Sequence, residues 1–314
     1  MLNSGPCACS PVFTAIRNSV TNTVPAPKAA AAVEAARSTR ADAIVTIGGG
    51  SATGFGKIVR LDVDAAFIAV PTTYAGSEMT AIWGRTDDGH KRTGTDRRVK
   101  PDTVVYDPEL TLSLPASIAG PSGMNALAHC VEALYGPGAN PVIALHALEG
   151  IRALAAGLPA VCGPEDGIAA RTDVLYGAYL AGVALASGGT ALHHKTCHVL
   201  GGMFDLNHGD MNAVVLGHAL AYNAPAIPEL MGPIGSALGV AGSDAPAAIF
   251  ELARSIGAPT SLEAIGMPAD GIDAAARRVV DEAAANVRPP DEASIQRMLD
   301  DAFHGRVPAS PGTH

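Results

Sequence analysis

A short apolar run that passes straight into three glycines and a serine constrains the fold more than any other feature of the sequence. The run IleValThrIle at 44–47 is typical of a buried strand, and the glycines end it before a helical pattern resumes. Apolar runs later in the chain alternate with helical segments in the same way. The elements expected are helices at 25–40 and 52–61 and strands at 44–47, 67–71 and 103–106. Strands that alternate with helices imply a parallel sheet with crossover helices, so we expect an α/β fold.

The chain changes character after Pro115. The polar residues 84–102 indicate a loop or a β-hairpin, and residues 107–115 carry prolines near both ends, as a connection between two units does. Beyond this connection the sequence shows helical periodicity and no strand-like runs. Helices are expected at 123–135, 142–156, 167–186, 190–200, 212–223, 228–239, 244–255, 271–286 and 293–303. We therefore predict an α/β domain over 1–115 and an all-helical domain over 116–314.

Charge and composition exclude several classes of protein. With 30 acidic and 21 basic residues the net charge is −9, which repels phosphate backbones and anionic lipid surfaces, so neither nucleic acid nor a membrane is expected as a partner. The longest uncharged stretch, 175–192, is interrupted by SerGlyGlyThr and predicts a buried helix rather than a membrane span. The five cysteines form no CxxC pair and the N-terminus does not resemble a secretory signal. We expect a cytoplasmic location.

The glycine-rich segment at 48–57 is the first candidate for a binding site. Glycines between a strand and a helix let the backbone approach a ligand, and the helix start offers N–H groups to a pyrophosphate. The segment is not a P-loop, because Ser51 stands where that motif has glycine and Ile58 stands where it has Ser or Thr. It does not match the regular GxGxxG pattern either. A phosphate cradle is favoured, and a purely structural tight turn remains the alternative.

The histidines are the second candidate. His194 and His198 are four residues apart, on one face of an expected helix, and His208 follows beyond a turn. Asn125 and His129 have the same spacing on the first helix of the second domain. Three imidazoles and one side-chain oxygen could bind iron or zinc, although an amide at Asn125 gives the ion no negative charge and weakens this interpretation. The alternative, that these histidines cap helices or satisfy core polar groups, stays open.

Several segments together resemble the iron-containing, or group III, alcohol dehydrogenase superfamily and, within it, the maleylacetate reductase family. The matching segments are IGGGS at 47–51, PTTYAGSEMT at 71–80, YDPELTLSLP at 106–115, NALAH at 125–129, HHKTCHVLGG at 193–202 and HGDMNAVVLGHALAYN at 208–223. The resemblance implies a Rossmann-like nucleotide-binding domain, a helical domain of dehydroquinate synthase-like architecture, and an active site in the cleft between them. Members usually have one further strand-helix-strand unit before the segment that begins here near Val12, so the first domain is expected to be shortened.

The resemblance also implies roles for individual residues. The metal-site positions are Asn125, His129, His194 and His208. His198 is the additional active-site histidine, and we expect His194, His198 and Lys195 to act in catalysis. The histidines are expected to be donors to an oxyanion, and Lys195, or alternatively a basic residue of the loop at 85–100, is expected to bind a substrate carboxylate. His193 is expected to project in another direction from the helix. The implied cofactor-binding residues are Gly49, Gly50, Ser51, Thr72, Thr73, Ser77 and Lys91. Maleylacetate reductases commonly carry Asn at the position of Asn125, so bound metal is not required.

The activity implied is NAD(P)H-dependent reduction of maleylacetate, a small dicarboxylate, to 3-oxoadipate in the catabolism of aromatic compounds. We expect the protein to be a homodimer. Two other functions remain open. One is a metal-dependent alcohol dehydrogenase that acts on a small carbonyl compound or alcohol. The other is an inactive homologue whose shortened first domain no longer binds a dinucleotide.

Overall fold

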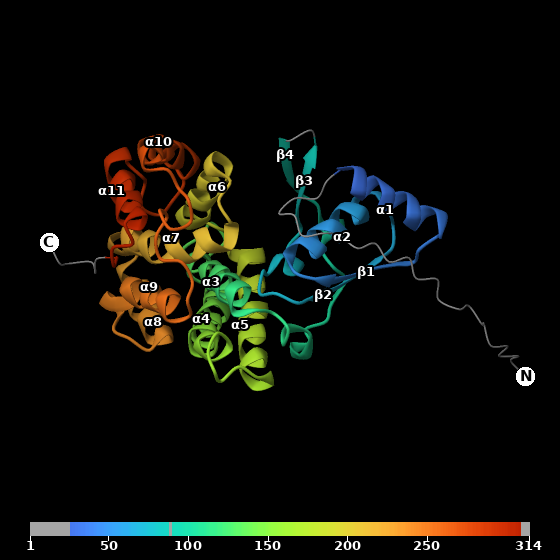
Figure 1. Ribbon diagram of the computed structural model, residues 1–314, viewed down its shortest axis with the longest axis horizontal. Helices are drawn as coiled ribbons and strands as arrows, with labels where there is room; N and C mark the ends of the chain where they lie inside the picture. The colour runs from blue at the N-terminus through green and yellow to red at the C-terminus, as the bar shows by residue number, and fades with distance from the viewer. Residues whose placement is uncertain (1–25, 88–89, 309–314) are drawn as a thin grey trace, which may run out of the picture.

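The chain forms a small sheet-containing half and a larger bundle of helices, placed side by side (Figure 1). The structure is a computed structural model, and it describes residues 26–87 and 90–308. Three parallel strands lie in the order β1-β2-β5, with Ala43 opposite Ala66 and Ile68 opposite Thr103. The strands and helices of this half are α1 (Ala26–Ser38), β1 (Ala43–Gly48), α2 (Gly50–Asp62), β2 (Ala66–Pro71), β3 (Ile82–Asp87), β4 (His90–Thr95) and β5 (Thr103–Val104). The expected alternation of helix and strand in a parallel sheet is confirmed.

Apolar packing between the first two helices holds this half together. Ala32 and Val33 of α1 pack in one cluster with Ile58 and Val59 of α2, and all four side chains are buried. Both helices lie on the same side of the sheet (Figure 1). The polar stretch after β2 is a hairpin, in which β3 and β4 pair antiparallel. Of the two alternatives for residues 84–102, the hairpin is the one observed.

The last strand of the parallel sheet is short. The run at 103–106 gives only two residues of β5, although the Val105 N–H still donates to the Ala69 carbonyl at 2.9 Å. The chain leaves the sheet here because Tyr106 turns toward the interior, where its hydroxyl donates to Glu78 Oε1 at 2.9 Å. β5 is therefore shorter than the apolar run at 103–106 that predicted it.

All nine helices expected in the second half are present. They are α3 (Ala116–Ala133), α4 (Pro141–Val161), α5 (Ile168–Gly188), α6 (Leu192–Phe204), α7 (His208–Asn223), α8 (Pro228–Leu238), α9 (Ala245–Ser255), α10 (Ile272–Glu282) and α11 (Glu292–Phe303). The largest difference is at α3, which starts at Ala116 rather than 123. Gly120, Pro121 and Gly123 are poor helix formers that hide the start of this helix in the sequence. All three are buried, so tertiary packing overrides their propensity.

Two long apolar helices lie in the core of the bundle. The stretch 175–192 forms most of α5, with Leu175, Leu180 and Ala181 buried, and the helix ends at Gly189, whose φ is +77°. By its length and composition alone, α4 could cross a membrane. It packs against α3 and α5, however, and its buried Ile151 and Leu154 belong to the main core cluster. Core helices of soluble proteins have the same length and composition.

The two halves are joined by buried contacts as well as by the chain. Tyr74, which follows β2, is fully buried in the core of the helical half, and its N–H donates to Ser122 Oγ at 2.9 Å. Arg171 of α5 pairs with Asp166 at 2.6 Å and also donates to the Leu114 carbonyl at 3.0 Å and to the Thr111 carbonyl. The division at 115 and 116 stays a prediction, and these contacts fix the connection to α5.

Replacement of Arg171 by Met is expected to lower the free energy of unfolding by about 2–4 kcal/mol, because Asp166 and two backbone carbonyls lose their partner. The urea midpoint measures this loss. The control is Arg152→Met on α4, which removes an exposed ion pair with Glu149 and should cost less than about 0.5 kcal/mol. Equal losses for the two variants would contradict the role given to Arg171.

Candidate active site

The glycine-rich turn lies at the carboxyl edge of the parallel sheet, where α/β proteins bind ligands. Gly48 has a φ of +148°, which glycine adopts readily. A Cβ at Gly49 would lie 2.8 Å from Thr73 Cγ2, and one at Gly50 would lie 3.2 Å from Ala75 Cβ. Gly49 precedes α2, and among the described residues no side chain caps this helix. The turn is therefore tight, and it leaves the positive end of α2 without a side-chain cap next to Thr73.

The segment that follows β2 is anchored from the sheet half by a buried lysine. Lys57 of α2 is fully buried, and its Nζ donates to the Ser77 carbonyl at 2.7 Å, to Thr80 Oγ1 at 2.9 Å and to the Ile82 carbonyl at 2.8 Å. Burial lowers the pKa of Lys57 to about 8, against the opposing charge of Glu78. The sequence analysis used Lys57 only to test for a P-loop. Its actual partners place it under the loop that carries Ser77.

The structure brings together six of the seven residues expected to bind the cofactor. Gly49 precedes α2 and Gly50 and Ser51 begin it. Thr72, Thr73 and Ser77 follow β2, the neighbouring strand. The remaining residue is Lys91, whose backbone belongs to β4 and whose side chain lies outside the described part of the chain.

Imidazole rings from three helices converge in the helical half. His129 comes from α3, His194 and His198 come from α6, and His208 begins α7. The ring centroids are 4.8 Å apart for His129 and His194, 6.4 Å for His194 and His208, and 6.3 Å for His198 and His208. Asn125, His129 and His194 are buried, while His198 and His208 are exposed. The expected convergence of these helices is therefore present in the structure.

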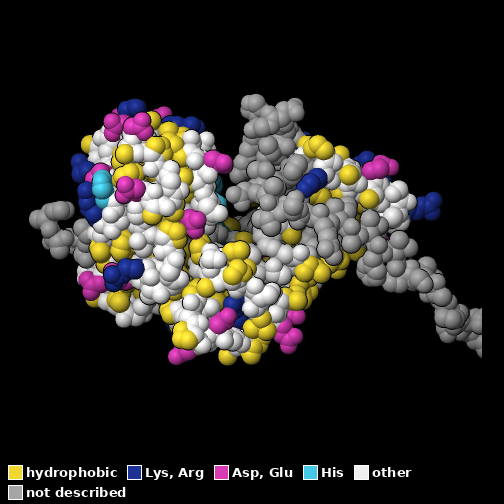
Figure 2. Space-filling view, in the orientation of Figure 1, with side chains coloured by type: hydrophobic (Ala, Val, Ile, Leu, Met, Phe, Trp, Pro, Cys, Tyr) yellow, Lys and Arg dark blue, Asp and Glu magenta, His cyan; other side chains and the backbone are white. Residues whose placement is uncertain are grey.

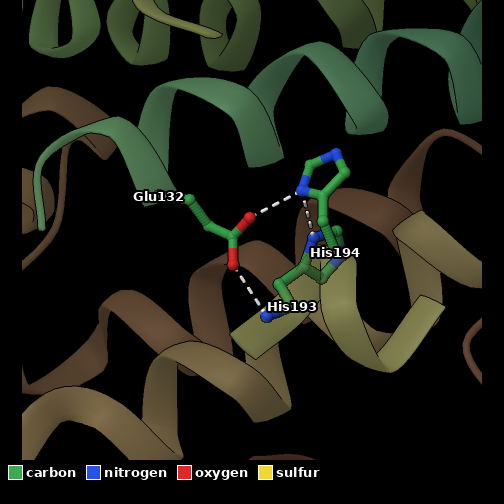
Figure 3. A group of neighbouring side chains, drawn as sticks. All are labelled: Glu132, His193 and His194. Carbon is green, nitrogen blue, oxygen red and sulfur yellow. Dashed lines mark hydrogen bonds and ion pairs between the residues drawn. The ribbon is translucent and has the colours of Figure 1, made fainter. Parts of the chain in front are cut away.

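A buried carboxylate beneath this cluster was not expected from the sequence. Glu132 of α3 is fully buried; its Oε1 accepts the His193 backbone N–H at 2.7 Å and its Oε2 lies 2.6 Å from His194 Nδ1 (Figure 3). The sequence signal that could have indicated this carboxylate is that Glu132 is a single acidic residue in the apolar stretch 123–135, three residues after His129. One helical turn brings these two positions to the same side of α3.

His193 was expected to project in another direction from the helix, but it is not remote from the site. Its ring is fully buried, edge-on to His194 with 4.8 Å between centroids, and its Nε2 lies 3.1 Å from the Asn212 carbonyl oxygen. This histidine therefore satisfies core polar groups. Replacing it would disturb His194, so it is unsuitable as an inert control.

Burial dominates the ionisation of this cluster. It lowers the pKa of His193 to about 3 and that of His194 to about 4, and it lowers the pKa of His129 well below its usual value. Burial also raises the pKa of Glu132, while the His193 charge and three backbone hydrogen bonds oppose that rise. We take the imidazoles of His129, His193 and His194 as neutral at pH 7, because burial lowers the pKa of all three.

A pocket of about 250 Å³ connects the two groups of residues. Its walls include Thr73 from the cofactor segment, Ser122 and Asn125 from α3, and His208 and Asp210 from α7. Histidine atoms are visible in the recess between the two halves (Figure 2). The pocket is therefore lined by residues of both groups.

The residues fit a metal ion only in part. Asn125 Oδ1 and His194 Nε2 are buried without a hydrogen-bond partner among the described residues, as atoms that await a ligand or water would be. Asn125, His129, His194 and His208 could hold iron or zinc, which would act as a Lewis acid on a carbonyl oxygen. All four ligands are neutral, so the affinity falls short of that given by a carboxylate. Glu132, His193 and His194 also lie close together, but their 2.6 Å and 3.2 Å contacts are hydrogen bonds.

Lys195 is the one proposed catalytic residue without a contact to the cluster. It follows His194 directly, so its side chain leaves α6 about 100° further round the helix. The side chain is half-buried and makes no hydrogen bond or ion pair with the residues that the structure describes. Its role in binding a carboxylate stays a prediction.

The fold is that of iron-containing alcohol dehydrogenases. A family model described as "Iron-containing alcohol dehydrogenase" matches residues 10–108, and one described as "Fe-containing alcohol dehydrogenase family, C-terminal" matches residues 120–303. The chain belongs to this family.

The similar relatives within the family include maleylacetate reductases. One from Sphingobium indicum is 48% identical over 285 residues, which cover 91% of this chain and 80% of that protein. Another, from Burkholderia cepacia, is 50% identical over 270 residues, or 86% of this chain and 76% of that protein. The crystal structure of maleylacetate reductase from Agrobacterium tumefaciens superimposes with a TM-score of 0.88 at 43% identity, and the match covers 92% of this chain and 81% of that one.

Replacement of Asn125 by Asp is expected to raise the affinity for Zn²⁺ or Co²⁺ at least tenfold, because it adds a negative charge beside the same three imidazoles. A cobalt titration followed by absorbance measures the change. Asn207→Asp is the matched control, since Asn207 lines the same pocket but caps α7. No gain for Asn125→Asp would mean that the four side chains do not converge on an ion.

Proposed function

We propose that this protein reduces maleylacetate to 3-oxoadipate with NADH or NADPH. The observation that carries the proposal is the pocket that joins Thr73, at the dinucleotide end of the sheet, to Asn125 and His208 of the histidine cluster. Maleylacetate reductases that are 48–50% identical to this chain support the choice of substrate. Catabolism of aromatic compounds in the cytoplasm, by a homodimer, is the setting that we propose.

The reaction we propose is a conjugate reduction. Hydride from the nicotinamide adds to the carbon–carbon double bond of the enone, negative charge moves onto the ketone oxygen, and a proton completes the product. The developing oxyanion needs a donor positioned at the place where its charge appears. His198 and His194 lie on one helix face, 6.4 Å apart between ring centroids, so both can face the same bound ketone.

The remaining residues bind the two ligands. We propose that Gly49, Gly50, Ser51, Thr72, Thr73 and Ser77 bind the cofactor phosphates and ribose, with Lys91 beside them. Lys195 is proposed to bind a substrate carboxylate. Asn125, His129, His194 and His208 form the position of the family's metal site, which iron or zinc would occupy weakly because its ligands carry no charge.

Turnover of maleylacetate by the purified protein tests the function directly. Oxidation of NADH or NADPH is followed by absorbance, and 3-oxoadipate is identified as the product. His198→Ala should reduce turnover ~10² to 10³-fold, the range for loss of one oxyanion donor, with little change in cofactor affinity. His146→Ala, on the exposed side of α4, is the control. Activity that requires added metal and acts on simple alcohols instead would contradict the proposal.

The cofactor site is tested by Gly49→Ala. The new Cβ would lie 2.8 Å from Thr73 Cγ2 and 2.9 Å from Thr73 Oγ1, so Thr73 has to move away from the helix start. We expect the dissociation constant for NADH to rise tenfold or more, measured by quenching of protein fluorescence. Gly232→Ala is the matched control, because a Cβ at that helical glycine meets open space. Unchanged NADH affinity in Gly49→Ala would place the cofactor elsewhere.

A further inference from the structure

We propose that Glu132 and His193 are positioning residues that fix the tautomer of His194, with its proton on Nδ1 and the lone pair of Nε2 facing the cleft. All three side chains are buried, and the ring of His194 turns Nδ1 toward Glu132 and Nε2 away from it (Figure 3). Two independent sets of contacts give the same position for the proton.

The first set starts at a backbone carbonyl. The Asn212 carbonyl oxygen can only accept a hydrogen bond, so His193 Nε2, at 3.1 Å from it, carries a proton. In a neutral imidazole the other nitrogen, His193 Nδ1, is then bare. That bare nitrogen lies 3.2 Å from His194 Nδ1. The contact is a hydrogen bond only if His194 Nδ1 supplies the proton.

The second set starts at the carboxylate. Glu132 Oε1 accepts the His193 backbone N–H at 2.7 Å, and Glu132 Oε2 lies 2.6 Å from His194 Nδ1. When Glu132 is ionised it only accepts, and this contact too then requires a proton on His194 Nδ1. The opposite tautomer would set two bare nitrogens against each other and leave an oxygen facing a lone pair. In buried surroundings such unmade bonds cost about 1–3 kcal/mol each.

This tautomer gives His194 and His198 different roles in the reaction, and this part rests on the proposed function. His194 Nε2 is buried and has no hydrogen-bond partner among the described residues, so it offers a lone pair to a hydroxyl, a water or a metal ion. A neutral ring with this tautomer has no Nε2 proton to give to an enolate. The proton donor of the reaction is therefore His198, whereas His194, which the sequence analysis expected to be a second donor, orients the ligand as an acceptor. Carboxylates that orient a histidine in this way are common around metal sites.

Nitrogen NMR of the free protein tests the tautomer without substrate or cofactor. The protein is labelled with ¹⁵N-histidine, treated with chelator, and measured at neutral pH, with His194 assigned by comparison with His194→Gln. We expect a protonated Nδ1 and a bare Nε2 in the wild-type protein. A protonated Nε2 overturns the proposal, whether or not the protein reduces maleylacetate. The tautomer is read from the wild-type chain, and the variant serves only to assign the His194 signals.

The role of Glu132 is tested by Glu132→Gln. The glutamine carbonyl should keep the fixed His193 N–H, and its amide group then faces His194 Nδ1 as a donor, which favours the Nε2–H tautomer. We expect the dominant tautomer of His194 to invert. Glu149→Gln, an exposed carboxylate on α4, is the matched control and should leave the spectrum of His194 unchanged. A His194 tautomer that is the same in Glu132→Gln and wild type would overturn the role of Glu132.

Discussion

The site depends on one short segment, 72–80, that is anchored in both halves of the molecule. On the sheet side the ammonium group of Lys57 bonds the carbonyl of Ser77, and on the helical side the N–H of Tyr74 bonds Ser122. Within the same segment a Cβ at Gly76 would lie 3.4 Å from His129 Nδ1. A displacement of this segment would therefore alter the cofactor end and the histidine end of the pocket together.

Much of this arrangement could be predicted from the sequence. The glycines after the first strand place a ligand-binding turn at the carboxyl edge of a parallel sheet, since strand ends and helix starts are local features. The spacing of four between Asn125 and His129, and between His194 and His198, gives each pair one helix face. Such local periodicity also predicted all nine helices of the second half. It does not predict where α3 starts, because Gly120 and Pro121 have low helix propensity and are helical only through their buried packing.

The supporting residues could not be predicted, because their roles are set by contacts between distant parts of the chain. In the sequence, Lys57 only belongs to a segment that does not match a phosphate-binding motif. Its hydrogen bonds to the carbonyls of Ser77 and Ile82 are evident only from the structure. Glu132 is 61 and 62 positions from the two histidines that it contacts. His193 could be assigned a direction on its helix, but not a partner on α7. Sequence patterns identify residues that meet a ligand more readily than those that hold them in place.

The amide of Asn125 has a consequence for how such enzymes diversify. Asparagine and aspartate have the same shape, so exchanging one for the other changes the charge in the pocket while leaving the backbone and the three imidazoles where they are. A carboxylate at this position would give a bound cation the negative charge that the amide lacks. One substitution can thus change the affinity of the pocket for a cation on an unchanged scaffold.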